Sequence, residues 1–371
     1  MTRNLQSFSS TYAEARQKFI DAAKAAGATL EAYVHPTAKG PNGEVLSIDV
    51  ARMGSSNPHT LLVTSSGVHG IEGYCGSGGQ ISVLNDKLLA DMPPGVAVVH
   101  VHALNPYGFA HSRRTNEDNV DLNRNFIDWN APRPAEHPLT AEIYPLLLPS
   151  DYDGADKARC DAAIEALIAK NTLKAYQAGF TQGQYRFADG LYYGGKGPVW
   201  SHQMWRQIIA KHSAGCRNVV HVDLHTGLGP YGYGELIFVD SKQTPTYKLA
   251  HSWWGDSVTS VVDGNSTSTK ITGDVAEVLR GLPPEQMGLS ITIEFGTVPV
   301  KEVLDSLAAD NWLTFKGDMN SPMAARIKRQ IRYCFYGEEP VWKGMIIDRV
   351  HQVLEQAKRG ISDLPGQQNA A

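Results

Sequence analysis

Residues 60–76 read TLLVTSSGVHGIEGYCG, a stretch that combines three kinds of local structure. The compact apolar run Thr60–Thr64 predicts a buried strand. The turn Gly67–Gly73 has glycines at both ends and in its middle, which allow backbone conformations closed to other residues. Apolar residues at helical spacing between Ile81 and Leu89 predict a helix after the turn. A strand, a glycine loop and a helix in this order are typical of an α/β fold.

The same rhythm returns along the chain, and polar clusters follow the predicted strands. Alternation from Glu44 to Val50 predicts one further strand, and Ser10 or Thr11 could cap a first helix. We therefore expect a mostly parallel sheet with helices on both faces, and sites beyond the carboxyl ends of its strands. Three more predicted strands and the clusters that end them are Val96–Ala103 before Asn105-Pro106, Val219–Leu224 before His225-Thr226-Gly227, and Leu289–Ile293 before Glu294-Phe295-Gly296.

The composition is that of a folded, globular protein. Hydrophobic residues make up 42% of the 371 residues and charged residues 19%. A formal net charge of -4 and a pI near 6.3 give no overall attraction to nucleic acid or to an anionic membrane surface. We expect a single domain over residues 1–371, with a tail after about residue 360 that is polar enough to fray.

The N-terminus and the cysteines indicate where the protein works. Met1–Tyr12 lacks the apolar stretch of a secretory signal, and no later segment is apolar enough to span a bilayer. The four cysteines are scattered without a close pair, which argues against a thiolate metal site or a dithiol redox motif. We therefore expect a cytoplasmic protein with buried cysteines that binds neither nucleic acid nor membranes. The sequence leaves the oligomeric state open.

Two histidines and a glutamate suggest a metal site. His69 and Glu72 are three residues apart, a spacing that can bring both side chains to one side of a helical turn. Catalytic zinc commonly takes two histidines and one carboxylate and keeps a fourth position for water. His225, at the end of its strand, is the candidate for the other histidine, and His221 is a rival that lies deeper in the strand. Asp223 shares their face and could accept a hydrogen bond from a histidine.

Other charged residues could supply the remaining chemistry. Glu294 closes an apolar strand, and a carboxylate there could take a proton from an attacking water and pass it to a leaving amine. Arginine forks recognise carboxylates and stabilise developing oxyanions. Arg124, with Asn123, could therefore hold a substrate carboxylate, and Arg113 or Arg114 could polarise the scissile carbonyl.

In their order along the chain, these motifs resemble the zinc carboxypeptidase superfamily, including its aspartoacylase and succinylglutamate desuccinylase branch. The resemblance covers residues 69 to 296, and the combination is far more specific than any single motif. The matching motifs are His69-x-x-Glu72, Asn105-Pro106-x-Gly108, Asp121-Leu122-Asn123-Arg124-Asn125-Phe126, Asp223-Leu224-His225-Thr226 and Glu294-x-Gly296.

The resemblance implies a fold and a set of roles. The implied fold is a central mixed, mostly parallel twisted sheet flanked by helices, with one zinc ion per chain. Carboxypeptidases also carry a substrate-binding tyrosine before the base, for which Tyr231, Tyr233 and Tyr247 are the candidates here. The implied roles are zinc ligation by His69, Glu72 and His225, proton transfer by Glu294, carboxylate binding by Asn123 and Arg124, and carbonyl polarisation by Arg114 in preference to Arg113.

The leading hypothesis is hydrolysis of an amide bond next to a carboxylate, as at a peptide C-terminus. Its alternative within the same chemistry is deacylation of an N-acyl amino acid. Two other classes are a carboxylate-binding relative without catalysis and an esterase that uses Ser65-Ser66-Gly67 as a nucleophile turn. The partner implied by the leading hypothesis is a small-molecule or peptide substrate with a free carboxylate.

Overall fold

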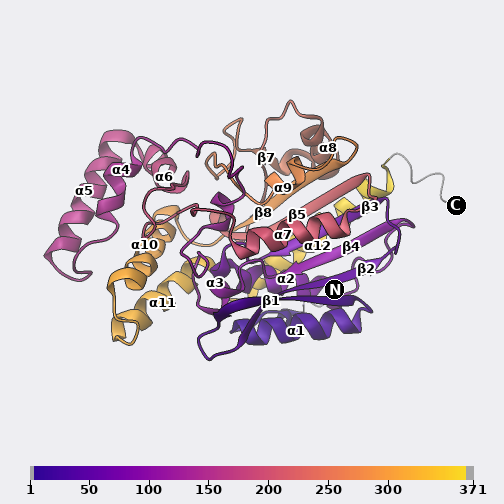
Figure 1. Ribbon diagram of the computed structural model, residues 1–371, viewed down its shortest axis with the longest axis horizontal. Coiled ribbons are helices and arrows are strands. Elements are labelled where there is room, and N and C mark those ends of the chain that lie inside the picture. Colours follow the sequence, from indigo (N-terminus) through magenta and orange to yellow (C-terminus); the bar gives the residue numbers. More distant parts are fainter. Residues whose placement is uncertain (1–3, 365–371) are drawn as a thin grey trace.

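A computed structural model of the chain describes residues 4–364 and has one mixed sheet at its centre (Figure 1). The sheet has eight strands in the order β1-β2-β4-β3-β5-β8-β6-β7. The strands are β1 Thr29–Lys39, β2 Val45–Gly54, β3 Thr60–Ser66, β4 Val96–His102, β5 Asn218–Tyr231, β6 Gly234–Phe238, β7 Val258–Ser260 and β8 Met287–Gly296.

The centre of the sheet is parallel and its flanks are partly antiparallel. β4, β3, β5 and β8 run parallel to one another, and β6 and β7 also pair in parallel. β1 and β2 pair antiparallel, as do β2 and β4, and β8 and β6. The predicted central mixed, mostly parallel sheet is therefore confirmed. The sequence had not indicated β1, β6 and β7. β1 and β7 lie at the two edges of the sheet. Most residues of β1 are exposed or half-exposed, and β7 has only three residues, so neither has a clear hydrophobic pattern.

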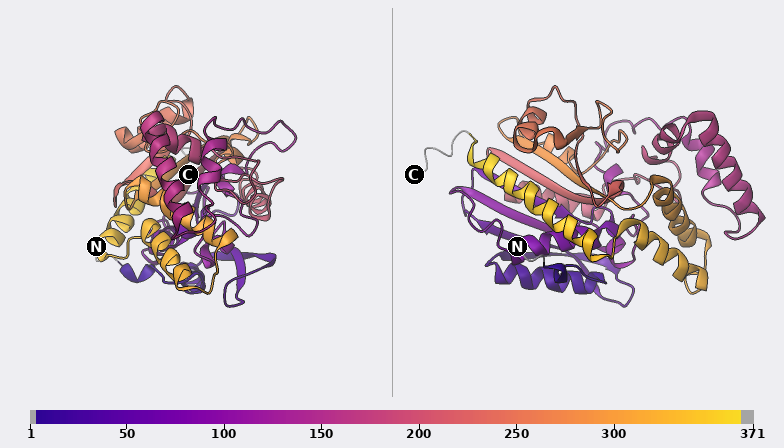
Figure 2. Two further views of the ribbon diagram at one scale, coloured as in Figure 1. Left: turned by 90° about the vertical axis from the view of Figure 1, so that its left-hand side faces the viewer. Right: turned by 180° about the vertical axis from the view of Figure 1, so that it is seen from behind.

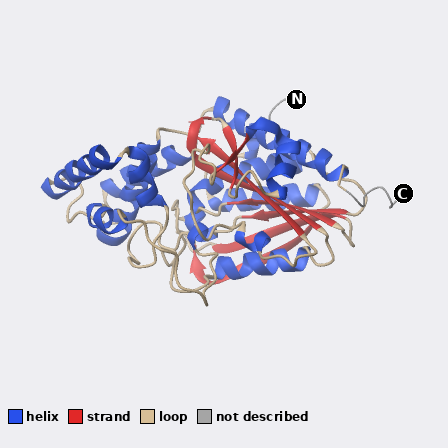
Figure 3. Ribbon diagram, turned by 90° about the horizontal axis from the view of Figure 1, so that it is seen from above, coloured by secondary structure: helices blue, strands red, loops and turns tan. Residues whose placement is uncertain are grey.

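Helices cover both faces of the sheet, and short 3-10 turns mark several chain reversals (Figure 3). The helices are α1 Tyr12–Ala25, α2 Gly73–Asn85, α3 Pro106–Ala110, α4 Thr140–Ile143, α5 Ala155–Asn171, α6 Leu173–Thr181, α7 Trp200–His212, α8 Pro245–Trp254, α9 Glu277–Arg280, α10 Val300–Lys316, α11 Pro322–Phe335 and α12 Pro340–Ser362. The 3-10 turns are η1 Leu5–Ser7, η2 Gly70–Glu72, η3 Leu122–Arg124, η4 Tyr144–Leu146 and η5 Gly255–Ser257.

Alternation along the strands explains why both faces are covered. Leu62 of β3 packs into one core with residues of α2, α8 and α12, whereas Leu61 and Val63 pack into another core with residues of α7 and α9. Successive side chains of a strand point to opposite faces, so an apolar run needs a cover on each side. Figure 2 shows α12, in yellow, lying along the sheet on the first of these faces.

A helical extension stands at one end of the molecule. α4, α5 and α6 lie there beside α10 and α11 (Figure 1). Leu148 packs against Trp312 and Leu313 of α10 and against Ile327 of α11, which attaches this extension to the rest of the chain. The extension follows η3, which carries Arg124, in the long connection between β4 and β5.

Several local predictions can be compared with this structure. Thr11 caps α1 by accepting a hydrogen bond from Glu14 N at 3.2 Å, as the sequence suggested. The four cysteines are buried and free. Between residues 4 and 364, no helix combines the length and the apolar character needed to cross a membrane. α12 continues to Ser362, and most of the tail expected to fray lies outside the described residues.

Candidate active site

The turn after β3 places His69 and Glu72 side by side. His69 precedes η2 and Glu72 ends it, and His69 Nδ1 lies 2.8 Å from Glu72 Oε1. Only Gly67 uses the left-handed region, with φ of 64°. Gly70 is needed for space instead, because an added Cβ would lie 2.0 Å from the carbonyl carbon of Gly108 in α3. The glycines of this turn therefore meet two different needs, a left-handed backbone at Gly67 and space for α3 at Gly70.

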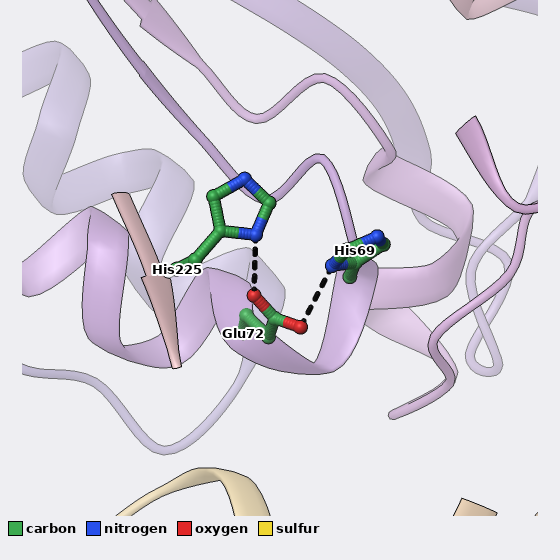
Figure 4. A group of neighbouring side chains, drawn as sticks. All are labelled: His69, Glu72 and His225. Carbon is green, nitrogen blue, oxygen red and sulfur yellow. Dashed lines mark hydrogen bonds and ion pairs between the residues drawn. The ribbon is translucent and has the colours of Figure 1, made fainter. Parts of the chain in front are cut away.

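β5 brings His225 to the same place. β3 and β5 are parallel neighbours in which Ser66 pairs with Leu224, so His225 lies beside the turn after β3. β5 continues to Tyr231, beyond the end at Leu224 that the sequence predicted. His225 Nδ1 lies 2.9 Å from Glu72 Oε2 (Figure 4). One nitrogen or oxygen from each of His69, Glu72 and His225 lies within 4.8 Å of the others, close enough for one metal ion.

The outward nitrogens of both histidines meet carboxylates. His225 Nε2 lies 2.5 Å from Asp223 Oδ2, and His69 Nε2 lies 3.2 Å from Asp121 Oδ1. A histidine that binds a metal through one nitrogen usually donates its other N–H to a carboxylate or a carbonyl. His69 Nε2 is also 2.7 Å from Arg114 Nη2. A cation at Nδ1 requires the proton on Nε2, with Asp121 as its acceptor; Arg114 Nη2 is also a donor and cannot keep its hydrogen bond to Nε2 in that state.

His221 and Ser65 lie behind the cluster and have structural partners. His221 Nε2 lies 2.7 Å from Ser65 Oγ, and its Nδ1 lies 2.9 Å from Ser290 Oγ. Burial lowers the pKa of His221 to about 4. Ser65 donates to Asp223 Oδ1 at 2.5 Å and is fully buried. Both nitrogens of His221 are therefore occupied, and the Ser65 hydroxyl is closed to a substrate.

Buried charges of opposite sign hold the cluster together. Burial acts to raise the pKa of Glu72, but His69 and His225 outweigh it and the pKa is lowered. Burial acts to lower the pKa of His225, but Asp223 and Glu72 raise it well above its usual value. The pKa of Asp121 is well below its usual range because Arg114 outweighs the effect of burial. The neighbouring histidines and Arg114 therefore keep the buried carboxylates of this pocket ionised.

Glu294 comes from the next strand. In the parallel pairing of β5 and β8 it lies directly opposite His225, so both side chains stand on the same face of the sheet. Glu294 is 7% exposed, and its Oε1 accepts a hydrogen bond from Leu228 N at 3.0 Å. Burial and the nearby Glu72 raise the pKa of Glu294 to about 8. It is the titratable carboxyl that faces the cluster from β8.

The structure separates the two adjacent arginines. Arg114 reaches the cluster, with Nη1 3.5 Å from Glu72 Oε1 and with Nε donating to Asp121 Oδ2 at 2.9 Å. Arg113 points elsewhere: its Nε donates to Asp310 of α10 at 3.2 Å and its Nη2 donates to Asn119 at 3.0 Å. Of the two, Arg114 is therefore the one near the candidate metal ligands.

Asn123 and Arg124 face the same space from η3. Arg124 Nη1 donates to Asn123 O at 2.8 Å, and Nε donates to Thr181 O at 3.0 Å, with Nη2 directed at the same oxygen. Asn123 Oδ1 accepts from Val275 N at 3.1 Å. Main-chain partners thus fix both side chains and leave further N–H donors of each for a ligand.

A cavity of about 340 Å³ opens from the cluster. Its wall is formed by α6 together with residues 261–276, and Thr181 Oγ1 lies 2.7 Å from Thr269 Oγ1 where the two meet. We call these two segments the wall. We call the following group the floor: His69, Glu72, His225 and Glu294.

The tyrosine in the cavity is one that the sequence analysis did not select. Tyr192 lines it, from a glycine- and tyrosine-rich stretch that had no assigned role. Tyr231 and Tyr233 are each 47% exposed and lie outside the lining, and Tyr247 is buried with its hydroxyl on Val258 O at 3.1 Å. Asp121 was also missed as a positioning residue, although its motif was noted. No periodic pattern would have indicated either residue.

A comparison with protein-family models matches residues 8–349 to the family described as "Protein of unknown function (DUF2817)". A search of curated proteins found no match. A carboxypeptidase A from Helicoverpa armigera is 12% identical, with a TM-score of 0.43 and coverage of 87% of this chain and 73% of that one. An aspartoacylase family protein from Mesorhizobium loti is 15% identical, with a TM-score of 0.34 and coverage of 79% and 68%. A metallo-carboxypeptidase from Pseudomonas aeruginosa, solved with (2-guanidinoethylmercapto)succinic acid, is 13% identical, with a TM-score of 0.38 and coverage of 91% and 68%.

Proposed function

The chain belongs to the DUF2817 family, and we propose that it is a zinc-dependent hydrolase that cleaves an amide bond adjacent to a carboxylate, in the manner of a carboxypeptidase. One observation carries the proposal. His69, Glu72 and His225 converge from two neighbouring strands, and Glu294 from the third faces them across one cavity. Core packing alone does not account for this concentration of buried charge.

The donor set suits zinc. Two imidazole nitrogens and one carboxylate oxygen within 4.8 Å of one another are the ligands of many catalytic zinc sites, which keep a further position open. Asp121 and Asp223 supply the outer contacts that fix the tautomer of a liganding histidine. We propose one ion per chain. When bound, it would act as a Lewis acid on the scissile carbonyl and on water.

Glu294 is the proposed base. Its carboxyl lines the cavity beside the cluster, and among residues 4–364 its one hydrogen-bond partner is Leu228 N. Glu294 would accept the proton of the attacking water and transfer it to the leaving nitrogen, which releases the amine. The Leu228 contact keeps one oxygen in place while the other handles the proton.

In this proposal, each arginine binds a different group of the substrate. Arg114 lies against Glu72 and would stabilise the negative charge that develops on the carbonyl oxygen. Arg124 and Asn123 lie farther along the cavity and would hold the substrate carboxylate through their remaining N–H groups. In this proposal, the distance from Arg114 to Arg124 determines which bond is cleaved, namely the amide bond next to the substrate carboxylate.

A second candidate within the same chemistry is deacylation of N-acyl amino acids. The contact between Thr181 and Thr269 joins α6 to residues 261–276 and closes the cavity on that side. A closed side favours a small conjugate over a long peptide. A carboxylate-binding protein without catalysis is the remaining alternative, and the presence of Glu294 in the cavity speaks against it.

Replacing the base tests the proposal. We expect Glu294→Gln to keep its zinc and to lose activity on N-acyl amino acids and dipeptides by about 10²- to 10⁴-fold, because it cannot accept a proton. Zinc content by elemental analysis and kcat by product release are the measurements. Glu285→Gln is the control, since Glu285 is exposed and outside the cavity. Full activity in Glu294→Gln would rule out the assigned base, and a zinc-loaded wild type without activity on either substrate class would rule out the reaction.

A further inference from the structure

A second cavity lies beside the catalytic one, and none of the proposed roles uses it. It has a volume of about 300 Å³ and is lined by residues of α8, α9, β6 and β8. The two cavities share part of their lining, so they are direct neighbours. We call the residues that line both of them the partition: Val239, Asp240, Ala276, Arg280 and Ser290.

The catalytic cavity leads from the proposed base to the partition. Ser290, Thr292 and Glu294 alternate along β8, and all three line the cavity. Four residues of a strand span about 13 Å, so the cavity continues well beyond the base toward Ser290. β6 runs antiparallel beside this stretch, where Ile237 pairs with Thr292 and also lines the cavity. A substrate held at Glu294 therefore has open space along β8.

The groups proposed to hold the substrate carboxylate lie on the same side. Asn123 Oδ1 accepts from Val275 N, in the connection that leads directly into α9, and α9 carries Arg280 of the partition. α10, in contrast, begins beyond the other end of β8. In the proposed function, the part of the substrate next to its carboxylate is therefore the part that faces the partition.

The two charged side chains of the partition make only a weak contact. Arg280 Nη1 lies 3.7 Å from Asp240 Oδ2, which is longer than a hydrogen bond. The stronger contacts of Arg280 are with its own segment, where Nη2 lies 3.0 Å from Asp274 Oδ2 and 2.7 Å from Glu277 Oε1. The Arg280 and Asp240 side chains are 30% and 42% exposed, so water screens their pair. A chain that passes between them would break this contact and leave the stronger ones in place.

Beyond the partition, the second cavity is mainly apolar. Among residues 4–364, no charged side chain outside the partition lines it. Phe238 and Leu279 are its most buried members, each 3% exposed, and Leu282, Pro283 and Pro284 add further apolar surface. Such a lining suits a hydrocarbon chain, because each CH₂ group that leaves water strengthens binding by up to about fourfold.

We propose that the second cavity binds the distal end of an unbranched apolar chain that the substrate carries next to its carboxylate. The chain runs along β8 past Thr292 and enters between Arg280 and Asp240. The inference rests on the proposed function and narrows its substrate class to amino acid conjugates or peptide ends whose side chain is too long for the catalytic cavity alone.

Binding of two probes of different length tests the inference. The probes are N-acetyl-2-aminohexanoic acid and N-acetyl-2-aminodecanoic acid, measured by calorimetry on zinc-loaded Glu294→Gln, in which turnover does not interfere. We expect the longer probe to bind about 10- to 100-fold more tightly, because its four additional carbons are buried. Adding Thr246→Trp should remove most of this gain and leave the shorter probe unchanged. Thr246 is half-exposed on α8 and lines only the second cavity, which the indole would fill.

A control and a second variant complete the experiment. Ser252→Trp adds the same indole at an exposed position of α8 outside both cavities, so the gain should remain. Leu282→Trp fills the second cavity from the connection before β8 and should act as Thr246→Trp does.

The outcomes separate the inference from the proposed reaction. Equal affinity for the two probes in the parent protein would overturn the inference, as would a gain that persists in both variants that fill the cavity. A zinc-loaded wild type that binds the longer probe more tightly but hydrolyses neither would support the second cavity as a binding site and contradict the reaction.

Discussion

The floor and the wall of the cavity are built in different ways. The floor consists of buried side chains that contact one another, and its members His69, Glu72 and His225 are each at most 5% exposed. The wall mixes apolar and polar residues, and several of its polar residues are half-exposed, such as Thr181 and Thr269, which contact each other. The first region stands on three strands of one sheet, and the second joins a helix to a long connection.

We expect the floor to carry the metal binding and the reaction, and the wall to determine which substrates enter. Strand register fixes the floor, because Ser66 pairs with Leu224 and His225 pairs with Glu294. Sites on rigid strands hold their geometry within narrow limits, whereas connections can vary in length and sequence. We expect changes to the floor to abolish metal binding or turnover, and changes to the wall to alter which substrates are accepted.

Removing one ligand from the floor should have the largest effect. His225→Ala should lose its zinc and lower activity by more than about 10³-fold, since the metal and the base act together. Its free energy of unfolding should also fall by about 3–5 kcal/mol, because buried Glu72 loses a charged partner. Elemental analysis, steady-state kinetics and denaturant unfolding are the measurements.

His251→Ala is the matched control for that variant. His251 is exposed on α8 and its ion pair with Asp256 lies at the surface, so zinc and activity should be unchanged. A chelator should lower the unfolding midpoint of the wild type and leave that of His225→Ala unchanged. One bound zinc per chain in His225→Ala would contradict the assignment of His225 as a metal ligand, and with it the distinction between floor and wall.

Two carboxylates lie behind the floor, and replacing either should have an effect of intermediate size. Asp121 contacts both His69 and Arg114, whereas Asp223 contacts His225 and Ser65. Asp121→Asn and Asp223→Asn should each weaken zinc affinity by about 10- to 100-fold. At saturating zinc, only Asp121→Asn should keep a lowered kcat, because it also releases Arg114. Recovery of full kcat by both variants would show that Asp121 acts through the metal alone.

The sequence indicated the floor better than the wall for a physical reason. His69 and Glu72 share one turn, and His225 and Glu294 each follow an apolar run, so local patterns place them, although β5 continues past His225 to Tyr231. In a parallel sheet, such strand ends meet at one edge. The sequence did not distinguish Arg113 from Arg114, because adjacent side chains at a turn point apart according to tertiary partners such as Asp310.

The wall and Tyr192 had no comparable signal. The partners Thr181 and Thr269 belong to a short helix and an irregular connection, and their contact follows from the placement of both segments. Tyr192 occupies the cavity because of a left-handed backbone held by Gln184. The edge strands were missed for a related reason, since β1 is mostly exposed or half-exposed and β7 has only three residues. Long-range contacts between polar loops leave no periodicity in a sequence.

The smallest effect should come from loosening the wall. Thr181→Val and Thr269→Val each remove one hydroxyl of the pair at nearly constant volume. We expect the ratio of kcat/KM for N-acyl amino acids over longer peptides to fall by about 2- to 10-fold, with zinc content unchanged, because one hydrogen bond that closes the cavity is lost. The double variant should be no worse than either single one, since both remove the same contact. Thr314→Val, which changes a threonine of α10 outside the cavity, is the control. Additive losses, or a change in zinc content, would mean that the wall supports the metal site as well as selecting the substrate.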